Sequence, residues 1–312
     1  MTSPTLRLGT RGSRLALWQA ERVRELLTRL PGAPRVEIVE ISTSGDRIQH
    51  VALSQVGGRD FFTKDIEDAL LDGRVDLAVH SYKDLATDDP VGLRGGAVLE
   101  RADPRDALVA APGSTLTKLP EGATIGTSSL RRRAFVARVR PDLVCKELRG
   151  NVPTRIRKHE EGEYDALLLA SAGLDRLALD GHIAERIDPA QMYPAPAQGA
   201  VAVQIRQGDE DTARWVGPLN HGPTERATRA ERVLLNVLEG GCQVPVGALA
   251  VESGDDLILR ACVASLDGTR SAIGDETGPT QDPAVVGRTL GTRLLEEGAG
   301  EILDQIRNAA AG

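Results

Sequence analysis

The sequence is poor in the residues on which several classes of protein depend. Its three cysteines, Cys145, Cys242 and Cys262, show no Cys-x-x-Cys spacing, which excludes a disulfide scaffold and a thiolate zinc site. Its five histidines are scattered and form no His-Glu-x-x-His pattern. Aromatic residues make up only 3% of the chain, too few for the base-stacking surfaces of nucleic-acid-binding proteins. We therefore expect neither a metal nor a nucleic-acid partner.

Long apolar runs are also missing. The chain has no run of about 18 apolar residues, and no charged segment followed by an apolar run stands at its start. We therefore expect a cytoplasmic protein that does not use a membrane. Its 312 residues, 41% of them hydrophobic, suffice for two or three domains. No sustained heptad pattern is visible, so the expectation is a monomer without a stable protein partner.

Positive charge is gathered in one window of an otherwise acidic chain. Residues 126–158 hold ten Lys and Arg against two acidic residues, whereas the whole chain has a formal net charge of −7. The start, Gly126-Thr127-Ser128-Ser129, reads as a strand end, a capping turn and a helix start, and Arg131 and Arg132 follow. Backbone N–H groups at a helix start, beside hydroxyls and guanidiniums, form a site for carboxylate or phosphate groups.

The same arrangement recurs one strand and one helix later. There Arg149, Gly150 and Asn151 precede a predicted helix that carries Arg155. A solvated basic helix face is the alternative interpretation of either segment alone. The repetition favours a cleft that binds acidic groups.

Polar residues also follow two predicted strands near the N-terminus. Leu6–Gly9 leads to Arg11 and to Ser13, which caps a helix, and Val75–His80 leads to Ser81, Lys83 and Asp84. Open α/β sheets bind ligands at the carboxyl ends of their strands. A capping serine with a surface arginine, and an exposed Lys–Asp pair, remain the alternatives on these segments alone.

The order of the predicted elements describes two α/β lobes and a different C-terminal part. Two crossing segments, residues 100–105 and 194–200, join the lobes. Strands followed by helices predict doubly wound, mixed parallel sheets in both lobes, with a cleft between them. We expect lobe 1 at residues 1–99 plus 200–219, lobe 2 at 105–193, and a small α+β domain at 222–312. Residues 43–60 read as a long loop, of the kind that is either a lid or disordered.

Of the three cysteines, only Cys242 is placed for chemistry. Cys145 and Cys262 lie in apolar strand patterns and are expected to be inert core thiols. Cys242 follows a helix that ends at Gly240-Gly241, and a helix C-terminus raises a thiol pKa, which argues against a redox or protease-type nucleophile. Such a thiol can still capture a strong carbon electrophile and remain as a thioether. A buried small residue in a turn is the alternative.

Nine short motifs, each unspecific alone, stand in one order along the chain. They are Gly9-Thr10-Arg11 with Ser13, Leu15-Ala16-Leu17-Trp18-Gln19, Ala78-Val79-His80-Ser81 with Lys83-Asp84, Asp103-Pro104-Arg105-Asp106, Gly126-Thr127-Ser128-Ser129-Leu130-Arg131-Arg132, Leu148-Arg149-Gly150-Asn151-Val152, Ala172-Gly173-Leu174, Gln198-Gly199-Ala200 and Leu238-Glu239-Gly240-Gly241-Cys242-Gln243-Val244-Pro245. Together they resemble the hydroxymethylbilane synthases, or porphobilinogen deaminases, over essentially the full length.

The resemblance implies a transferase of tetrapyrrole and haem biosynthesis. In that family a dipyrromethane cofactor is linked as a thioether to the cysteine that matches Cys242. Four porphobilinogen molecules are added head to tail with loss of ammonia, and water releases the linear tetrapyrrole. Every ring carries acetate and propionate groups, which would account for the arginines. The implied fold is two lobes like type II periplasmic binding proteins and a third domain that carries the cysteine.

The resemblance also implies roles for individual residues. Asp84 would bind pyrrole N–H groups and stabilise cationic pyrrole intermediates. Phe62, otherwise a core residue, would stack on a ring, Ser81 would line the site, and Gln19 and Gln198 would be polar contacts. The cofactor and substrate acids would be held by Arg11, Ser13, Lys83, Thr127, Ser129, Arg131, Arg132, Arg149, Gly150, Arg155 and Arg176.

The chain departs from the family pattern at Gln55, Asp60, Ala86, Pro153 and Ala197. These positions touch the loop and the hinges, so they bear on motion and on the rate of elongation rather than on the reaction. A non-catalytic bilobed binder of a small anion is the alternative function, and it leaves the third domain and Cys242 unexplained.

Overall fold

The computed structural model describes residues 5–43, 63–238 and 244–311, with side chains as far as residue 308. These residues form two compact units. Unit 1 comprises the described parts of Met1–Val51, Gly58–Ala102 and Ala200–Glu225, and unit 2 those of Asp103–Gly199 and Arg226–Gly312. Among the described residues no helix is long and apolar enough to cross a membrane.

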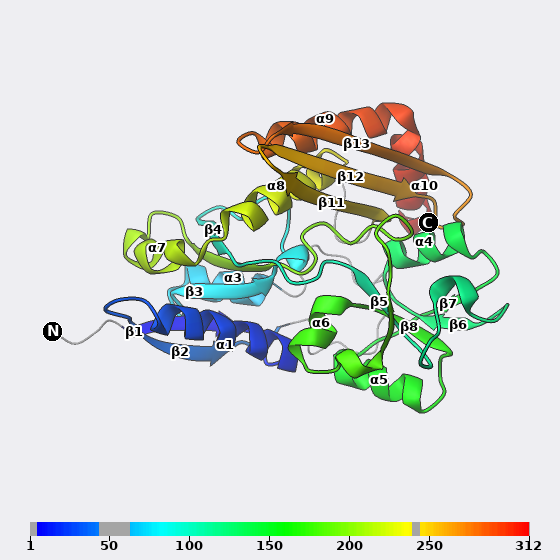
Figure 1. Cartoon of the computed structure of the whole chain (residues 1–312). Coiled ribbons are helices and arrows are strands. Elements are labelled where there is room, and N and C mark those ends of the chain that lie inside the picture. The colour runs from blue at the N-terminus through cyan, green and yellow to red at the C-terminus, as the bar shows by residue number, and fades with distance from the viewer. Residues whose placement is uncertain (1–4, 44–62, 239–243, 312) are drawn as a thin grey trace. The chain divides into compact units, whose positions relative to one another are not determined.

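Unit 1 is built on a five-stranded sheet with the strand order β2-β1-β3-β10-β4. Figure 1 labels β1, β2, β3 and β4 of this sheet. Its elements are β1 (Thr5–Thr10), α1 (Arg14–Thr28), β2 (Arg35–Glu40), α3 (Lys64–Leu71), β3 (Leu77–Ser81), the 3-10 turn η1 (Tyr82–Asp84), β4 (Leu93–Val98), β10 (Val201–Arg206), α7 (Glu210–Val216) and η4 (Gly217–Leu219). Strand β1 runs parallel to β2 and β3, and β10 runs antiparallel to β3 and β4. The sheet is therefore mixed, as predicted.

Both faces of this sheet are buried under helices. Leu77 and Val79 of β3 belong to one apolar cluster with Val23 and Leu27 of α1. The intervening residue, Ala78, belongs to a second cluster with α3. Because alternate residues of a strand point to opposite faces, α1 and α3 cover opposite sides of the sheet. This is the doubly wound arrangement that the strand–helix alternation predicts.

Unit 2 repeats the topology in a second five-stranded sheet, ordered β7-β6-β8-β5-β9. Its elements are β5 (Asp106–Val109), η2 (Leu116–Lys118), β6 (Thr124–Gly126), α4 (Leu130–Val139), β7 (Val144–Lys146), α5 (Val152–Glu160), β8 (Ala166–Ala170), α6 (Ser171–Arg176), η3 (Asp180–His182) and β9 (Ile183–Arg186). Here β6 lies between two parallel neighbours and β5 is the antiparallel strand. The two sheets thus have the same arrangement of parallel and antiparallel strands. The antiparallel strand is β10 in unit 1 and β5 in unit 2, and each follows one of the two crossing segments in the chain.

The C-terminal part of unit 2 is an antiparallel three-stranded sheet with helices, which confirms the predicted small α+β domain. Its elements are α8 (Gly222–Val237), which begins in unit 1, β11 (Val246–Ser253), β12 (Asp256–Ala264), β13 (Ser271–Pro279), α9 (Pro283–Leu294), η5 (Leu295–Ala299) and α10 (Gly300–Ala311). Leu257 and Leu259 of β12 share a core with α8, α9 and α10. Cys262 and Ala264 instead join the core that contains Phe135 of α4. The C-terminal end of β12 is therefore buried on both faces of the sheet.

The predicted elements differ from the observed ones mainly at their ends and in two strands. Helix α4 begins at Leu130 and is capped by Ser129, one residue later than predicted. Helix α8 begins at Gly222 and ends at Val237. The strands β9 and β13 were not predicted. The three-domain boundaries remain a prediction, and residues 44–60 of the predicted loop lie outside the described residues.

Two departures from the family pattern now have a structural context. Pro153 lies in the first turn of α5, where its missing N–H breaks no helical hydrogen bond. Ala197 is fully buried and has a φ of 62°, a left-handed conformation that costs a non-glycine residue roughly 1 kcal/mol. Its N–H donates to Glu231 Oε2 at 2.7 Å, which helps to hold the crossing in that conformation. Gln55 and Asp60 lie outside the described residues.

Two glycines of the C-terminal sheet test how closely it packs on α4. Gly254 and Gly268 both lie in turns, with φ values of 64° and 72°. A Cβ on Gly254 would meet nothing, whereas one on Gly268 would overlap the backbone of Ala137 and Arg138. We expect Gly254→Ala to lower the free energy of unfolding by about 1 kcal/mol and Gly268→Ala by a further 2 kcal/mol or so, as measured by urea denaturation. Equal losses would show that the contact with α4 yields at no cost.

Candidate functional site

In unit 1 the candidate residues gather at the carboxyl ends of β1 and β3. These strands are parallel neighbours. The chain runs from β1 into α1, which lies on one face of the sheet, and it reaches β3 from α3, which lies on the other face. That point is where the strand order reverses, the place at which open α/β sheets bind ligands. Ser13 caps α1 by accepting from the N–H of Ala16 at 3.3 Å. The short turn η1 after β3 presents Lys83 and Asp84.

A pocket of about 90 Å³ lies at this point, within unit 1. It is lined by Arg11, Ser13, Leu15, Ala16, Gln19, Thr63, Ile66, Val79, His80, Ser81 and Asp84. Whole small-molecule sites measure roughly 300–1,000 Å³, so this pocket takes one functional group of a ligand. The structure thus brings together Arg11, Ser13, Gln19, Ser81 and Asp84 at one pocket.

Some polar groups of the pocket already form hydrogen bonds within the protein, and others do not. Gln19 is buried, and its Nε2 donates to Ser81 Oγ at 2.9 Å, so this pair is a preformed wall. The Asp84 carboxylate is half-buried, and no described residue donates a hydrogen bond to it. It is therefore available to accept N–H groups from a ligand or to face a cation.

His80 lines the same pocket and is only 5% exposed. Burial, the largest influence, lowers its pKa to about 4. The Gln204 side chain opposes this shift, and the positive charge of Arg11 adds to it by a smaller amount. No described residue forms a well-shaped hydrogen bond with its Nε2. The imidazole is therefore neutral at pH 7 and adds no charge beside Asp84.

In unit 2 the hydroxyl groups after β6 organise the start of α4. Ser129 Oγ accepts from the N–H of Arg132 at 3.4 Å, and Thr127 Oγ1 accepts from the N–H of Ser129 at 3.2 Å. Ser128 Oγ donates to the carbonyl of Leu148 at 2.5 Å, which ties this turn to the segment after β7. Thr127 and Ser129 are thus capping residues of the helix that bears Arg131 and Arg132.

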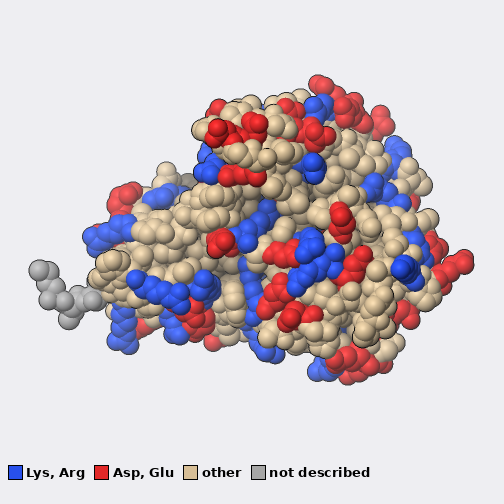
Figure 2. Space-filling model, in the orientation of Figure 1, with Lys and Arg blue, Asp and Glu red and all other residues tan. Residues whose placement is uncertain are grey.

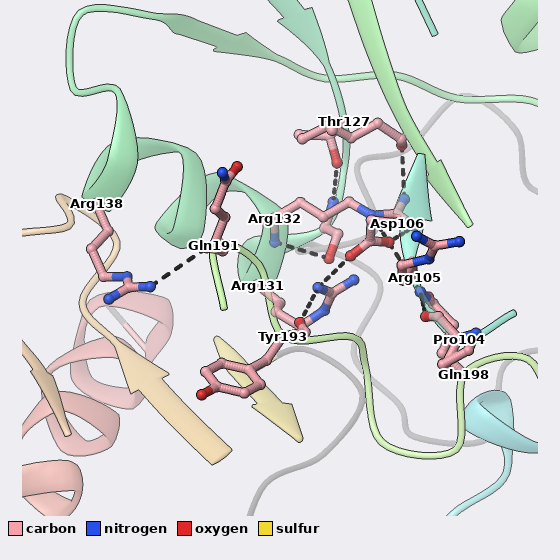
Figure 3. Close-up of polar contacts among 12 residues, drawn as sticks. Pro104, Arg105, Asp106, Thr127, Arg131, Arg132, Arg138, Gln191, Tyr193 and Gln198 are labelled. Carbon is pink, nitrogen blue, oxygen red and sulfur yellow. Dashed lines mark hydrogen bonds and ion pairs between the residues drawn. The ribbon is translucent and has the colours of Figure 1, made fainter. Parts of the chain in front are cut away.

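The two arginines of α4 converge on one buried carboxylate, that of Asp106 at the start of β5 (Figure 3). Arg131 Nη1 donates to Asp106 Oδ2 at 2.6 Å, and Arg132 donates from Nε and Nη2 to Oδ1 at 3.0 and 2.7 Å. Gln198 Nε2 adds a bond to Oδ1 at 3.1 Å. Asp106 is completely buried, yet these cations and bonds hold its pKa far below the usual range. The carboxylate is therefore permanently charged.

A second set of candidates lies at the start of α5. Asn151 caps this helix by accepting from the N–H of Thr154 at 3.0 Å. Gly150 has a φ of 114°, and a Cβ there would press on the Thr154 side chain, so the turn requires glycine. Arg155 Nε donates to the carbonyl of Gly150 at 2.7 Å, which braces the turn.

Arg149 lies beside this turn, and one of its guanidinium nitrogens has no hydrogen-bond partner among the described residues. Its Nε lies 3.6 Å from Glu147 Oε1, and its Nη2 is buried with no hydrogen-bond acceptor among the described residues. A buried guanidinium N–H without an acceptor is costly. The group is therefore suited to take a carboxylate oxygen from a ligand.

The remaining two candidates hold the second crossing. Arg176 Nη2 donates to the carbonyl of Gly199 at 2.7 Å, and burial lowers the Arg176 pKa to about 10. Gln198 is fully buried and also donates to the carbonyl of Pro104 at 2.8 Å. The contacts that the structure shows for Arg176 and Gln198 are to other residues of the protein. Their contacts with a ligand remain predictions.

Several charges of the basic window are paired within the protein. On the face drawn in Figure 2, basic and acidic side chains are intermixed rather than separated into one positive field. Arg140 pairs with Asp142 at 2.6 Å, and Arg131 and Arg132 share Asp106. This window therefore presents individual hydrogen-bond donors to a ligand, such as Arg149 Nη2, rather than a broad cationic surface. In the described part of the chain no cluster of three metal-ligating side chains occurs.

The predicted roles of the cysteines are tested in part. Burial raises the pKa of the Cys262 thiol to about 11 and also raises that of Cys145. Both are therefore protonated, unreactive thiols at pH 7, as predicted. Cys242 and Phe62 lie outside the described residues.

Two residues that the sequence analysis quoted but gave no role, His80 and Asp106, prove central. A signal for Asp106 was present, because it opens the apolar strand Asp106-Ala107-Leu108-Val109. A carboxylate buried with such a strand must be paired, and the arginines were the available partners. For His80 the signal was its position in the apolar run Val75–His80.

Comparison with known proteins identifies relatives along nearly the whole chain. Residues 6–214 match the family model "Porphobilinogen deaminase, dipyromethane cofactor binding domain", and residues 226–296 match "Porphobilinogen deaminase, C-terminal domain". The porphobilinogen deaminase of Desulforudis audaxviator (strain MP104C) is 50% identical over 305 residues, covering 97% of this chain and 98% of its own. That of Moorella thermoacetica (strain ATCC 39073 / JCM 9320) is 47% identical over 302 residues, covering 97% and 96%.

Solved structures match more weakly. An ABC-transporter periplasmic substrate-binding protein from Coxiella burnetii is 16% identical, covers 69% of this chain and 91% of its own, and gives a TM-score of 0.43. The VFT2 domain of BvgS from Bordetella pertussis, as a double mutant, is 13% identical, covers 69% of this chain and 85% of its own, and gives a TM-score of 0.42. Likenesses of this size support no argument about this chain.

The buried His80 predicts a pH dependence of stability. Its folded-state pKa of about 4 lies below the value of about 6.5 in an unfolded chain, so the unfolded state binds the proton first as the pH falls. Stability that is present above about pH 6.5 is therefore lost toward pH 4, by about 3 kcal/mol for this group. Denaturant unfolding between pH 7 and pH 4.5 should show a smaller loss in His80→Gln than in the wild type. Equal losses in both proteins would contradict this.

Proposed function

The chain belongs to the porphobilinogen deaminase family, and on that premise we propose how its residues divide the work. The activity is that of the family: a transferase that forms hydroxymethylbilane from porphobilinogen on a dipyrromethane cofactor. The observation that carries the assignment of roles is the Asp84 carboxylate. It is half-buried in a pocket with Arg11 and Ser13, and no described residue donates to it.

The residues of unit 2 have the chemistry that the acid groups of a dipyrromethane require. The buried Nη2 of Arg149 has no acceptor, and Arg131 uses only its Nη1 on described residues. We propose that these arginines, with Arg132, Thr127, Ser129 and Gly150, form the surroundings of the cofactor's acetate and propionate groups. When bound, the dipyrromethane supplies the nucleophilic pyrrole carbon to which new units are joined. Its attachment to Cys242 remains a proposal from the resemblance.

Asp84 acts on the pyrrole that loses ammonia. As the carbon–nitrogen bond of the aminomethyl group breaks, the electron pair leaves with nitrogen and positive charge spreads over the pyrrole ring. A carboxylate that accepts the pyrrole N–H stabilises this charge and fixes the ring in place. Because His80 is neutral, Asp84 does not spend its charge on a neighbouring imidazolium.

The other predicted residues bind and orient. Arg11 and Ser13 are assigned to the acid groups of the incoming porphobilinogen and Lys83 to those of the cofactor, with Gln19 and Ser81 as the wall of the pocket. Arg149, Arg155, Arg176 and Gln198 are assigned to the acids of the growing chain, and Phe62 to stacking on a ring. Arg155 and Arg176 already donate to carbonyl groups, so their part is to hold the turn at Gly150 and the crossing at Gly199 as well.

We also propose a monomer in the cytoplasm. A thiol that must form a thioether has to stay reduced, and the cytosol keeps thiols reduced. The exposed large apolar side chains of the described residues, such as Trp18, Val91, Val144, Val251 and Leu295, lie on different elements. Scattered exposed apolar residues do not form a subunit interface.

Mass spectrometry tests the covalent cofactor directly. The intact wild-type protein, weighed after denaturation, should exceed its sequence mass by two deaminated porphobilinogen units, and Cys242→Ser should not. Cys145→Ser is the matched control and should carry the same excess as the wild type. If the wild type stays at its sequence mass even after incubation with porphobilinogen, the proposed attachment is wrong.

Steady-state kinetics test Asp84. Asp84→Asn keeps the shape and removes the charge, so a carboxylate that stabilises a cationic transition state should show its loss as a fall in kcat of about 10²–10³ with little change in KM. Asp89→Asn, an exposed aspartate five residues away, should keep wild-type kcat. Cofactor content is checked by mass first, because unloaded protein would also be inactive. Wild-type kcat in a loaded Asp84→Asn protein would remove Asp84 from the mechanism.

A further inference from the structure

Buried polar groups without a partner gather on one face of the sheet of unit 1. The described residues have seven buried side-chain polar atoms with no hydrogen-bond partner, and three of them are Thr63 Oγ1, His80 Nε2 and Gln204 Oε1. His80 and Ala78 point to the same face of β3, the face that α3 covers, and Gln204 of β10 lies opposite Ala78. Thr63 directly precedes α3. The three atoms therefore belong to the layer between α3 and the sheet.

Thr63 and His80 also line the pocket that contains Asp84. The exposed fractions of these two residues are only 2% and 5%. Thr63 occupies the N-cap position of α3, where a threonine hydroxyl usually accepts a helical N–H, but its hydroxyl forms no such bond. At this pocket the protein thus supplies a hydroxyl and an imidazole nitrogen that no described residue uses.

The polarity and size of the pocket limit what it can hold. A polar space of about 90 Å³ has room for ordered water, whose share of the liquid is roughly 30 Å³ per molecule. An apolar group would leave the buried hydroxyl and imidazole without partners, which is costly. A cation would be repelled by Arg11, whose charge already opposes protonation of His80. A water molecule is neutral and can both donate and accept, so it suits either tautomer of the imidazole.

We propose that Thr63 and His80 hold a water molecule beside Asp84, and that this water is the nucleophile that releases the finished tetrapyrrole. The inference rests on the proposed function, in which Asp84 stabilises a cationic pyrrole. The bond between the chain and its primer breaks with the electron pair left on the primer carbon, which takes a proton from solvent. The water oxygen bonds to the methylene carbon of the resulting cation and gives one proton to solvent. The step therefore consumes one water and no net proton, and it leaves the hydroxymethyl group of the product.

The weak basicity of His80 explains why this water does not end elongation early. A buried imidazole with a pKa of about 4 orients a water molecule but does not remove its proton at pH 7. Such a water is a slower nucleophile than a pyrrole carbon that is held against the same cation. It attacks when the chain presents no further pyrrole carbon there.

Thr63 allows a variant that removes the proposed contact with little effect on the fold. Thr63→Val keeps the branched shape and deletes a hydroxyl that bonds to no described residue. Thr63→Ser keeps the hydroxyl and is the conservative control. Ser171→Ala is the matched control, because Ser171 Oγ is also buried without a partner among the described residues but does not line this pocket. His80→Phe removes the imidazole nitrogens and keeps a planar ring.

The experiment follows the covalent species of each protein by mass. Cofactor-loaded protein is mixed with four equivalents of porphobilinogen, quenched in acid at intervals and weighed intact, with thermal unfolding midpoints recorded in parallel. Each addition should proceed within about threefold of the wild-type rate in every variant. In Thr63→Val and His80→Phe the species with four added units should decay about tenfold more slowly, the effect of one lost hydrogen bond, and so accumulate. Thr63→Ser and Ser171→Ala should match the wild type.

Two kinetic results would overturn the proposal. Equal slowing of every addition in Thr63→Val would assign the pocket to the substrate or to the departing ammonia. Decay of the four-unit species at the wild-type rate in Thr63→Val would remove Thr63 from the release step. If His80→Phe does not fold, the two Thr63 variants still decide the matter.

A crystal structure of the resting protein gives a readout that does not depend on activity. We expect a water molecule within hydrogen-bond distance of both Thr63 Oγ1 and His80 Nε2 in the wild type, and none there in Thr63→Val. A wild-type pocket without this water would also contradict the proposal. A wild-type protein that gains no mass from porphobilinogen would instead refute the proposed function, so the two failures are distinguishable.

Discussion

The burial of one carboxylate constrains much of unit 2. Asp106 opens a strand with no exposed side chain, so its charge must be met inside the protein, and the resulting network joins three separate segments. Arg131 and Arg132 bring the start of α4, Gln198 brings the second crossing, and Asp106 itself follows the first crossing. Buried ion pairs add little net stability, but breaking one costs about 3–5 kcal/mol. The network therefore fixes one arrangement of these segments more than it strengthens the fold.

Local signals explain which parts of the structure could be predicted from the sequence. The cap at Ser13, the turn at Arg149-Gly150-Asn151 and the buried strand that leads to Ser81 depend on neighbouring residues, and each was found where expected. Strand β13 was missed because, of its nine residues Ser271–Pro279, only Ala272 is buried. This strand forms because it pairs with β12, and its sequence has no alternation of apolar and polar residues that would predict it.

The same distinction holds for the candidate site. The sequence placed Arg11, Ser13, Ser81 and Asp84 together because strand ends converge in a doubly wound sheet. It could not show that Asp106 meets arginines 25 and 26 residues away, since that contact depends on the crossing of α4 over β5. Nor could it separate Arg131 from Arg132, because adjacent identical residues differ only in what surrounds them. Composition likewise suggested a cationic patch, whereas much of the basic window is paired internally.

The place of β10 in unit 1 has a consequence for how the chain is made. β10 separates β3 from β4 in the sheet, although in sequence it follows the whole of the second five-stranded sheet. During synthesis at about 5–20 residues per second, β3 emerges on the order of ten seconds before its partner. The edge of β3 stays unpaired for that time, an open template for wrong strand pairing. The arginine-bearing sheet, whose strands are contiguous in sequence, is complete on the ribosome before the sheet that presents Asp84.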